Sequence, residues 1–186
     1  DCIVGVSGGK DSTRQALYVR DELSLKPLLV TCTFPPEHVT ERGVHNLSNL
    51  VSLGFDCIQL APDPKVWKKM MLQSLLKYGN LYKPAEIALN ASVPKIAIAY
   101  HIPVCFFGEN DAMAFGAIDT GTGGDANKMK YSHTLGGGDP KKAELVTRDI
   151  TDKDLISYYY PSDKELDWGN LKIVYLGYYI KDFTRF

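Results

Sequence analysis

Residues 2–12, with the sequence CIVGVSGGKDS, decide the fold that the sequence predicts. The short apolar run at 2–6 is typical of a strand that is buried on both faces of a sheet. It leads directly into Ser7-Gly8-Gly9-Lys10-Asp11-Ser12, and residues 11–23 then carry apolar side chains at helical spacing. The stretch therefore predicts a strand, a tight glycine turn and a helix.

The rest of the chain continues this alternation of strands and helices. Further strands are expected at 27–34, 55–60, 102–107 and 171–180, and helices at 37–53, 64–78 and 84–100, with a polar, helix-like stretch at 140–160. The order predicts an α/β fold, a doubly wound, Rossmann-like parallel sheet of about five strands with helices on both faces. Such sheets bind ligands beyond the carboxyl ends of their strands, so sites are expected after residues 6, 33, 60 and 107.

Length and composition exclude several classes of protein. The 186 residues are enough for one domain with a sizeable core, and 45% apolar with 23% charged residues is typical of a globular protein. A net charge of −1 supplies no basic field for a nucleic-acid backbone, so nucleic acid is not the expected partner. No apolar run approaches the roughly 20 residues that cross a bilayer, so no membrane span is expected.

The four cysteines, Cys2, Cys32, Cys57 and Cys105, lie far apart and form no CxxC pair. All but Cys57 stand inside apolar runs, where a small buried thiol is expected. A reduced, cytoplasmic protein fits this usage, and no zinc site is expected within these residues.

The glycine turn has the composition of a phosphate site. Its two glycines let backbone N–H groups approach an anion, and the helix that follows presents free N–H groups and a positive dipole end. Ser7, Ser12 and Lys10 add donors, and Asp11 is explained if it binds Mg²⁺. The alternative is an ordinary turn with Asp11 or Ser12 as the helix N-cap. A Walker A loop is excluded, because it needs glycine at position 4 and a hydroxyl residue after Lys10.

SGGKDS at the end of the first strand resembles the signature of the PP-loop ATP pyrophosphatases, which implies an adenine nucleotide alpha-hydrolase-like fold. Members of that superfamily cleave ATP between its α- and β-phosphates and adenylate a substrate oxygen, which a nitrogen or sulfur nucleophile displaces. The resemblance implies that the pyrophosphate end of ATP binds Ser7, Gly8, Gly9, Lys10, Asp11 and Ser12, with Asp11 on Mg²⁺. It also implies that adenine binds the backbone of Val30, Thr31, Cys32 and Thr33.

Longer stretches are similar to one family of this superfamily, the N-acetyl sugar amidotransferases of bacterial surface-polysaccharide biosynthesis, among them the pseudaminic-acid and B-band O-antigen enzymes of lipopolysaccharide biosynthesis. The stretches are VSGGKDSTRQALYVRDEL, LKPLLVTCTFPP, FFGEN, GGGDPKKAELVTRDI and YLGYYIKDF. The resemblance implies that the acetamido group of a nucleotide-linked N-acetyl sugar becomes an acetamidino group, while ATP yields AMP and pyrophosphate.

The same resemblance implies partners and further segments. Ammonia is expected from a separate glutaminase subunit, through a synthase-like channelling subunit, because the sequence shows no glutaminase constellation of its own. Residues 1–186 are expected to form the PP-loop domain of a longer chain. An N-terminal metal-binding segment, with structural Zn²⁺, and a C-terminal extension are expected beyond them.

Two further residues are candidates for catalysis beside Lys10 and Asp11. Lys95, on the helix that leads into the fourth strand, is the expected cation at the α-phosphate, and a solvated helix lysine is the alternative. Glu109 follows Gly108, itself an expected nucleotide-binding residue, at the end of that strand. It is expected to accept a proton, bind Mg²⁺ or hold sugar hydroxyls, and a plain loop carboxylate is the alternative. The glycine-rich stretch 116–138 is expected to be a lid.

Two rival functions remain open. One is a PP-loop enzyme that modifies tRNA by thiolation or lysidine formation, which the neutral charge and the absence of CxxC pairs disfavour. The other is a non-catalytic adenine-nucleotide-binding module, which Lys10 and Asp11 disfavour because a sensor needs neither metal nor pyrophosphate capture.

Overall fold

The computed structural model describes residues 1–35, 39–108, 123–127 and 138–180. Within them lies a sheet of five strands in the order β3-β2-β1-β4-β5, in which every neighbouring pair is parallel. The strands are β1 (Cys2–Gly5), β2 (Pro27–Cys32), β3 (Cys57–Leu60), β4 (Val104–Phe107) and β5 (Lys172–Tyr175). The predicted α/β fold with a doubly wound parallel sheet is confirmed.

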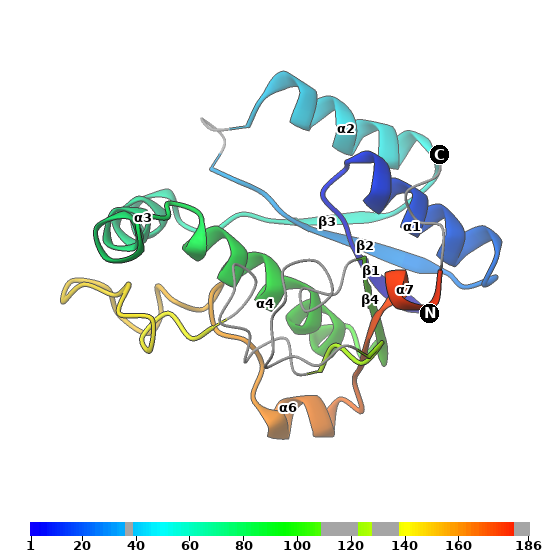
Figure 1. Ribbon diagram of the computed structural model, residues 1–186. Helices are drawn as coiled ribbons and strands as arrows, with labels where there is room; N and C mark the ends of the chain where they lie inside the picture. Colours follow the sequence, from blue (N-terminus) through cyan, green and yellow to red (C-terminus); the bar gives the residue numbers. More distant parts are fainter. Residues whose placement is uncertain (36–38, 109–122, 128–137, 181–186) are drawn as a thin grey trace.

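Helices cover both faces of this sheet (Figure 1). They are α1 (Lys10–Asp21), α2 (Glu41–Ser52), α3 (Pro64–Tyr78), α4 (Lys83–Ala99), α6 (Asp163–Trp168) and α7 (Leu176–Tyr179). Because successive side chains of a strand point to opposite faces, Val4 packs with Ala16 of α1, whereas Ile3 packs with Ala97 of α4. Figure 1 shows α1 and α2 on one side of the sheet and α4 and α6 on the other.

The strand order reverses between β1 and β4. From β1 the chain adds β2 and β3 on one side, and it then returns to add β4 and β5 on the other side of β1. The connections leave a crevice at such a switch point, at the carboxyl ends of the strands. The loop that follows β1 and the residues that follow β4 therefore lie at the place where a doubly wound sheet binds its ligand.

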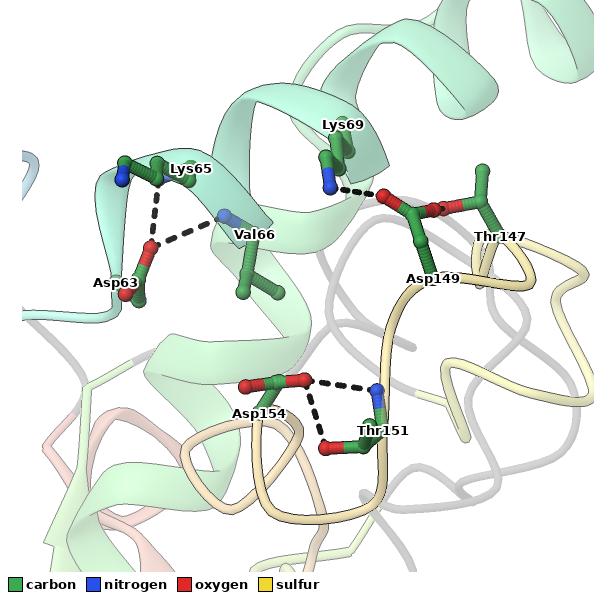
Figure 2. A network of polar contacts seen from close by, with 8 residues as sticks. All are labelled: Asp63, Lys65, Val66, Lys69, Thr147, Asp149, Thr151 and Asp154. Carbon is green, nitrogen blue, oxygen red and sulfur yellow. Dashed lines mark hydrogen bonds and ion pairs between the residues drawn. The ribbon is translucent and has the colours of Figure 1, made fainter.

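The prediction of a helix-like stretch at 140–160 is wrong, because the structure has a series of turns there. Short polar side chains hold these turns: Asp139 Oδ1 accepts from the Lys141 N–H at 2.8 Å, and Thr151 donates from N–H and Oγ1 to Asp154 Oδ2. Such local bonds compete with helix formation. Figure 2 shows how the Lys69–Asp149 ion pair ties this segment to α3.

The last strand, predicted at 171–180, is only about half as long in the structure. The strand ends at Tyr175, and α7 follows directly. Gly177 explains the bend, since its N–H donates to the carbonyl oxygen of Gly108 at 2.9 Å, and a Cβ there would lie 2.6 Å from the same oxygen. The chain therefore crosses the end of β4 at a distance that only glycine allows.

The buried-thiol prediction is confirmed for Cys2 and Cys105, while Cys32 is half-buried. Burial raises the pKa of Cys2 to about 11 and the pKa of Cys105 to about 12, so both thiols stay protonated at neutral pH. No helix in the described ranges is long and apolar enough to span a bilayer. Across the same residues, no three or more His, Cys, Asp or Glu side chains come together as a metal site.

Candidate functional site

A cavity of about 340 Å³ lies at the carboxyl ends of β1, β2 and β4. Residues of the glycine turn, of α1, of the strand ends and of α4 line it: Gly5, Val6, Ser7, Gly9, Lys10, Asp11, Ser12, Gln15, Val30, Cys32, Leu89, Ser92, Val93, Phe107 and Gly108. The structure thus brings together the loop after β1, the end of β2 and the end of β4. This is the crevice that the strand order predicts.

The turn after β1 needs its first glycine. Gly8 has φ of 77°, which L side chains rarely adopt, and a Cβ there would lie 3.1 Å from Asn46 Cβ on α2. One hydroxyl closes the turn: Ser12 Oγ accepts from the Ser7 N–H at 3.3 Å and donates to the Gly9 carbonyl at 3.1 Å. The loop is therefore held in shape before any ligand arrives.

Helix α1 begins without a side-chain cap. Its N-cap residue is Gly9, so the alternative with Asp11 or Ser12 as N-cap is wrong. The first helical bond runs from the Thr13 N–H to the Gly9 carbonyl at 3.0 Å. The N–H groups of the first turn precede that bond and have no acceptor within the helix. Lys10, Asp11 and Ser12, the residues of this first turn, line the cavity, and the positive end of the helix dipole favours an anion there.

Lys10 and Asp11 add one charge of each sign to this end of the cavity. Their side chains are 66% and 56% exposed, and Lys10 Nζ lies 4.0 Å from Asp11 Oδ1. A single carboxylate fits Mg²⁺, which typically keeps several waters and takes its other ligands from phosphates. Asp11 is therefore the residue that would hold Mg²⁺, and a bound Mg²⁺ would neutralise phosphate charge.

The structure brings two of the four expected adenine-binding residues to the cavity. Val30 and Cys32 line it, whereas Thr31 and Thr33 do not. The Val30 carbonyl accepts from the Val6 N–H at 2.9 Å, toward β1, and the Thr33 N–H donates to Leu60, toward β3. Because alternate residues of a parallel strand turn their polar groups to the same neighbour, the Cys32 backbone faces the side on which β1 has ended.

Lys95 does not reach this cavity. It lies two residues beyond Val93, about 200° further around α4, and so points away from the glycine turn. Lys95 lines another cavity, with residues of 152–165, and donates from Nζ to the Ile156 carbonyl. Burial lowers the pKa of its amine, an effect that Glu165 partly offsets. The structure therefore does not bring Lys95 together with the loop, and this placement argues against its expected role.

Glu109 lies outside the described residues, so its role stays a prediction. Gly108, which precedes it, lines the cavity as expected. Most of the expected lid, 116–138, is likewise outside the described ranges. Its described part, 123–127, lies beside β5, where the Ala126 N–H donates to the Ile173 carbonyl at 2.9 Å.

Several cavity residues escaped sequence reasoning. Leu89, Ser92 and Val93 come from one face of α4 with the spacing i, i+3, i+4, a signal that on its own indicates only a buried face. A neighbouring hollow of about 200 Å³ shares Cys32 and Leu89 with the cavity and adds Phe34, Trp67, Tyr82, Ala85 and Glu86. Three aromatic side chains thus stand beside the β2 end of the site.

The similarity to known proteins that the comparisons find lies in the structure. No protein-family model matches the sequence, and no curated protein matches it. The structure is similar to the crystal structure of a predicted subunit of tRNA methyltransferase from Methanocaldococcus jannaschii, with a TM-score of 0.48 and 14% sequence identity. The match covers 98% of this chain and 71% of that one. A likeness of this degree carries no argument about function.

Proposed function

We propose that this chain is an ATP-dependent, AMP-forming amidotransferase of the PP-loop type, acting on an N-acetyl sugar in the cytoplasm. One observation carries the proposal: the uncapped N-terminus of α1 opens, with the SGGKDS turn, into the cavity at the switch point of the sheet. Turns of this kind bind phosphate through backbone N–H groups. The sugar comes from the resemblance of the longer stretches to N-acetyl sugar amidotransferases.

The residues of the turn have distinct tasks in this proposal. The N–H groups of the first turn of α1, with Lys10, hold the pyrophosphate end of ATP and stabilise the charge that develops as pyrophosphate leaves. Asp11 holds Mg²⁺ against the same phosphates. Val30 and Cys32 border the part of the cavity that takes adenine, with the Cys32 backbone turned toward the base.

The reaction makes an amide oxygen into a leaving group. The acetamido oxygen attacks the α-phosphorus, and the bond between the α-phosphorus and the bridging oxygen of pyrophosphate breaks. Ammonia then adds to the activated carbon, and AMP departs with the former amide oxygen. The product keeps the carbon skeleton, with NH in place of the oxygen and one proton released. Ammonia comes from a separate glutaminase subunit, so glutamine alone does not support turnover.

Product analysis tests this proposal against both rival functions. The purified protein is incubated with MgATP and ammonium, together with nucleotide-linked N-acetyl sugars, with tRNA, or with neither. We expect AMP, pyrophosphate and an amidino sugar only with an N-acetyl sugar. AMP formation that requires tRNA would instead identify a tRNA-modifying enzyme. ATP binding without AMP formation under any of these conditions would identify a nucleotide-binding module.

A further inference from the structure

Gln15 is a buried amide with an unexplained donor. It lies on the inner face of α1 with Ala16 and Val19, and its side chain is 1% exposed. Its Nε2 has no hydrogen-bond partner among the described residues. A buried donor without a partner destabilises a protein, and most buried polar groups are therefore paired. The amide donor therefore lowers the stability of the free protein, and a bound ligand that accepts from it would remove this loss.

The position of Gln15 connects it to the phosphate end of the cavity. It lines the same cavity as Asp11 and Ser12, and it follows them by four and three residues. Side chains at that spacing lie on one side of a helix, so Gln15 stands one turn deeper beneath the first turn of α1.

The amide also reaches across to β4. A Cβ at Gly108 would lie 3.2 Å from Gln15 Oε1, which is tighter than most contacts of a real Cβ. The absence of a side chain at Gly108 therefore leaves room for the amide between α1 and the end of β4. Val93 and Phe107 also line this cavity, and apolar surroundings strengthen a hydrogen bond.

We propose that Gln15 is a phosphate-positioning residue, whose Nε2 donates to a phosphate oxygen of the bound adenine nucleotide. This inference rests on the proposed function, since it assumes that the nucleotide occupies this cavity. A neutral amide supplies a donor of fixed direction without adding to the charge of Lys10 and Mg²⁺. A phosphate oxygen is the acceptor that the neighbouring N–H groups of α1 already select.

Calorimetric binding of ATP, AMP, pyrophosphate and adenosine to Gln15→Met tests the proposal. Methionine has a similar length and no donor. Because a hydrogen bond to a charged group is lost, we expect the Kd for ATP to rise by about 10- to 100-fold. The AMP and pyrophosphate titrations show whether the α-phosphate or a terminal phosphate is the acceptor. The affinity for adenosine should not change. Gln73→Met, on α3 and outside the cavity lining, is the matched control.

Thermal unfolding of the proteins without ligand distinguishes a phosphate-positioning role of Gln15 from a structural role. Because Nε2 has no partner in the described part of the chain, Gln15→Met should unfold at the same temperature as the unchanged chain or higher. Gln15→Glu provides a second variant, in which a carboxylate repels phosphate and ATP binding should weaken further. A marked loss of stability in Gln15→Met, unchanged ATP affinity, or an equal loss of adenosine affinity would each overturn the proposal. Failure of the unchanged protein to bind ATP would instead refute the proposed function.

Discussion

Residues of helix α4 line two cavities, which differ in how far their polar groups are already bonded within the protein. The cavity at the glycine turn has about 340 Å³, and the cavity beside Lys95 has about 540 Å³. In the smaller one, the first turn of α1 is uncapped and Gln15 Nε2 lacks a described partner. The larger cavity also has a buried group without a described partner, Tyr160 Oη, so the uncapped first turn of α1 is what distinguishes the smaller one. Groups that await a ligand are the better guide to a site.

Three of the four charged residues in the lining of the larger cavity make contacts within the protein. Lys95 donates to the Ile156 carbonyl, and Asp152 accepts from Lys141 and from Tyr159 Oη. Glu165 accepts from the N–H and Oγ of Ser162 in the capping box of α6. The bond of Lys95 ties the turns of 140–160 to α4, and the other contacts hold these turns and the start of α6 internally. Lys95, Asp152 and Glu165 therefore have structural roles in the larger cavity.

The largest effect is expected from Asp11→Ala in the smaller cavity. Loss of the carboxylate that would hold Mg²⁺ should lower the rate of pyrophosphate release by roughly 10²- to 10³-fold, the scale of one lost charge-stabilising group. ATP affinity should change less, because the N–H groups of α1 remain. Steady-state kinetics at varied Mg²⁺ measures this, with Glu22→Ala at the far end of α1 as control. Full turnover by Asp11→Ala would remove Asp11 from the mechanism.

A pair of lysine variants compares the two cavities directly. Lys10→Met should raise the Kd for ATP by about 10- to 100-fold, since a charge-assisted hydrogen bond to phosphate is lost. Lys95→Met should leave the Kd and the turnover nearly unchanged, and should lower the free energy of unfolding by about 1 kcal/mol through its lost bond to Ile156. A collapse of turnover in Lys95→Met with normal stability would restore the role that the sequence predicts for it.

Two glycine variants test how closely the turn approaches α2. Gly8→Ala should lower the free energy of unfolding by about 1–2 kcal/mol from its positive φ, with a further loss from the contact with Asn46. Thermal unfolding should show a decrease in Tm of at least about 2–8 °C. Gly54→Ala is the control, because its φ is 88° and no atom lies within 4 Å of the added Cβ. Equal losses in the two variants would show that the close approach does not matter.

The smallest effect concerns the exposed ion pair between α3 and the turns (Figure 2). Hydrogen bonds from Lys69 and then Thr147 lower the pKa of Asp149 from 3.8 to about 2. The folded pKa lies below the unfolded one, so the ionised carboxylate stabilises the fold above about pH 4 and loses this effect as the pH falls to about 2. Unfolding temperatures of Asp149→Asn and the unchanged protein should differ slightly at neutral pH and converge over that window. A constant difference would contradict the assignment.

Much of the fold follows from patterns that are local in the sequence. The helix predicted at 64–78 is observed with those bounds, since Asp63 caps it and Gly79 adopts the left-handed conformation that ends it. The end of β5 depends instead on contact between Gly177 and Gly108, which are far apart in the sequence. The turns of 140–160 depend on which side chains bond their own backbone. Neither feature leaves a periodic signal.

The candidate site was predictable where it consists of consecutive residues. The turn from Ser7 to Ser12 lies as expected, because its glycines and the helix that follows dictate the geometry. The sequence predicted the wrong position for Lys95, because the direction in which a side chain of α4 points depends on how that helix is rotated against the sheet. Gln15 was missed because a glutamine inside an amphipathic helix usually marks the solvent face, and only packing shows that it is buried.

The structure of the protein with Mg²⁺ and a non-hydrolysable ATP analogue tests the central claim most directly. The account predicts the analogue in the cavity of about 340 Å³, with its terminal phosphates against the first turn of α1 and with Mg²⁺ on Asp11. Its base should lie beside Cys32 at the end of β2. A nucleotide bound instead beside Lys95, or phosphates turned away from α1, would contradict the account.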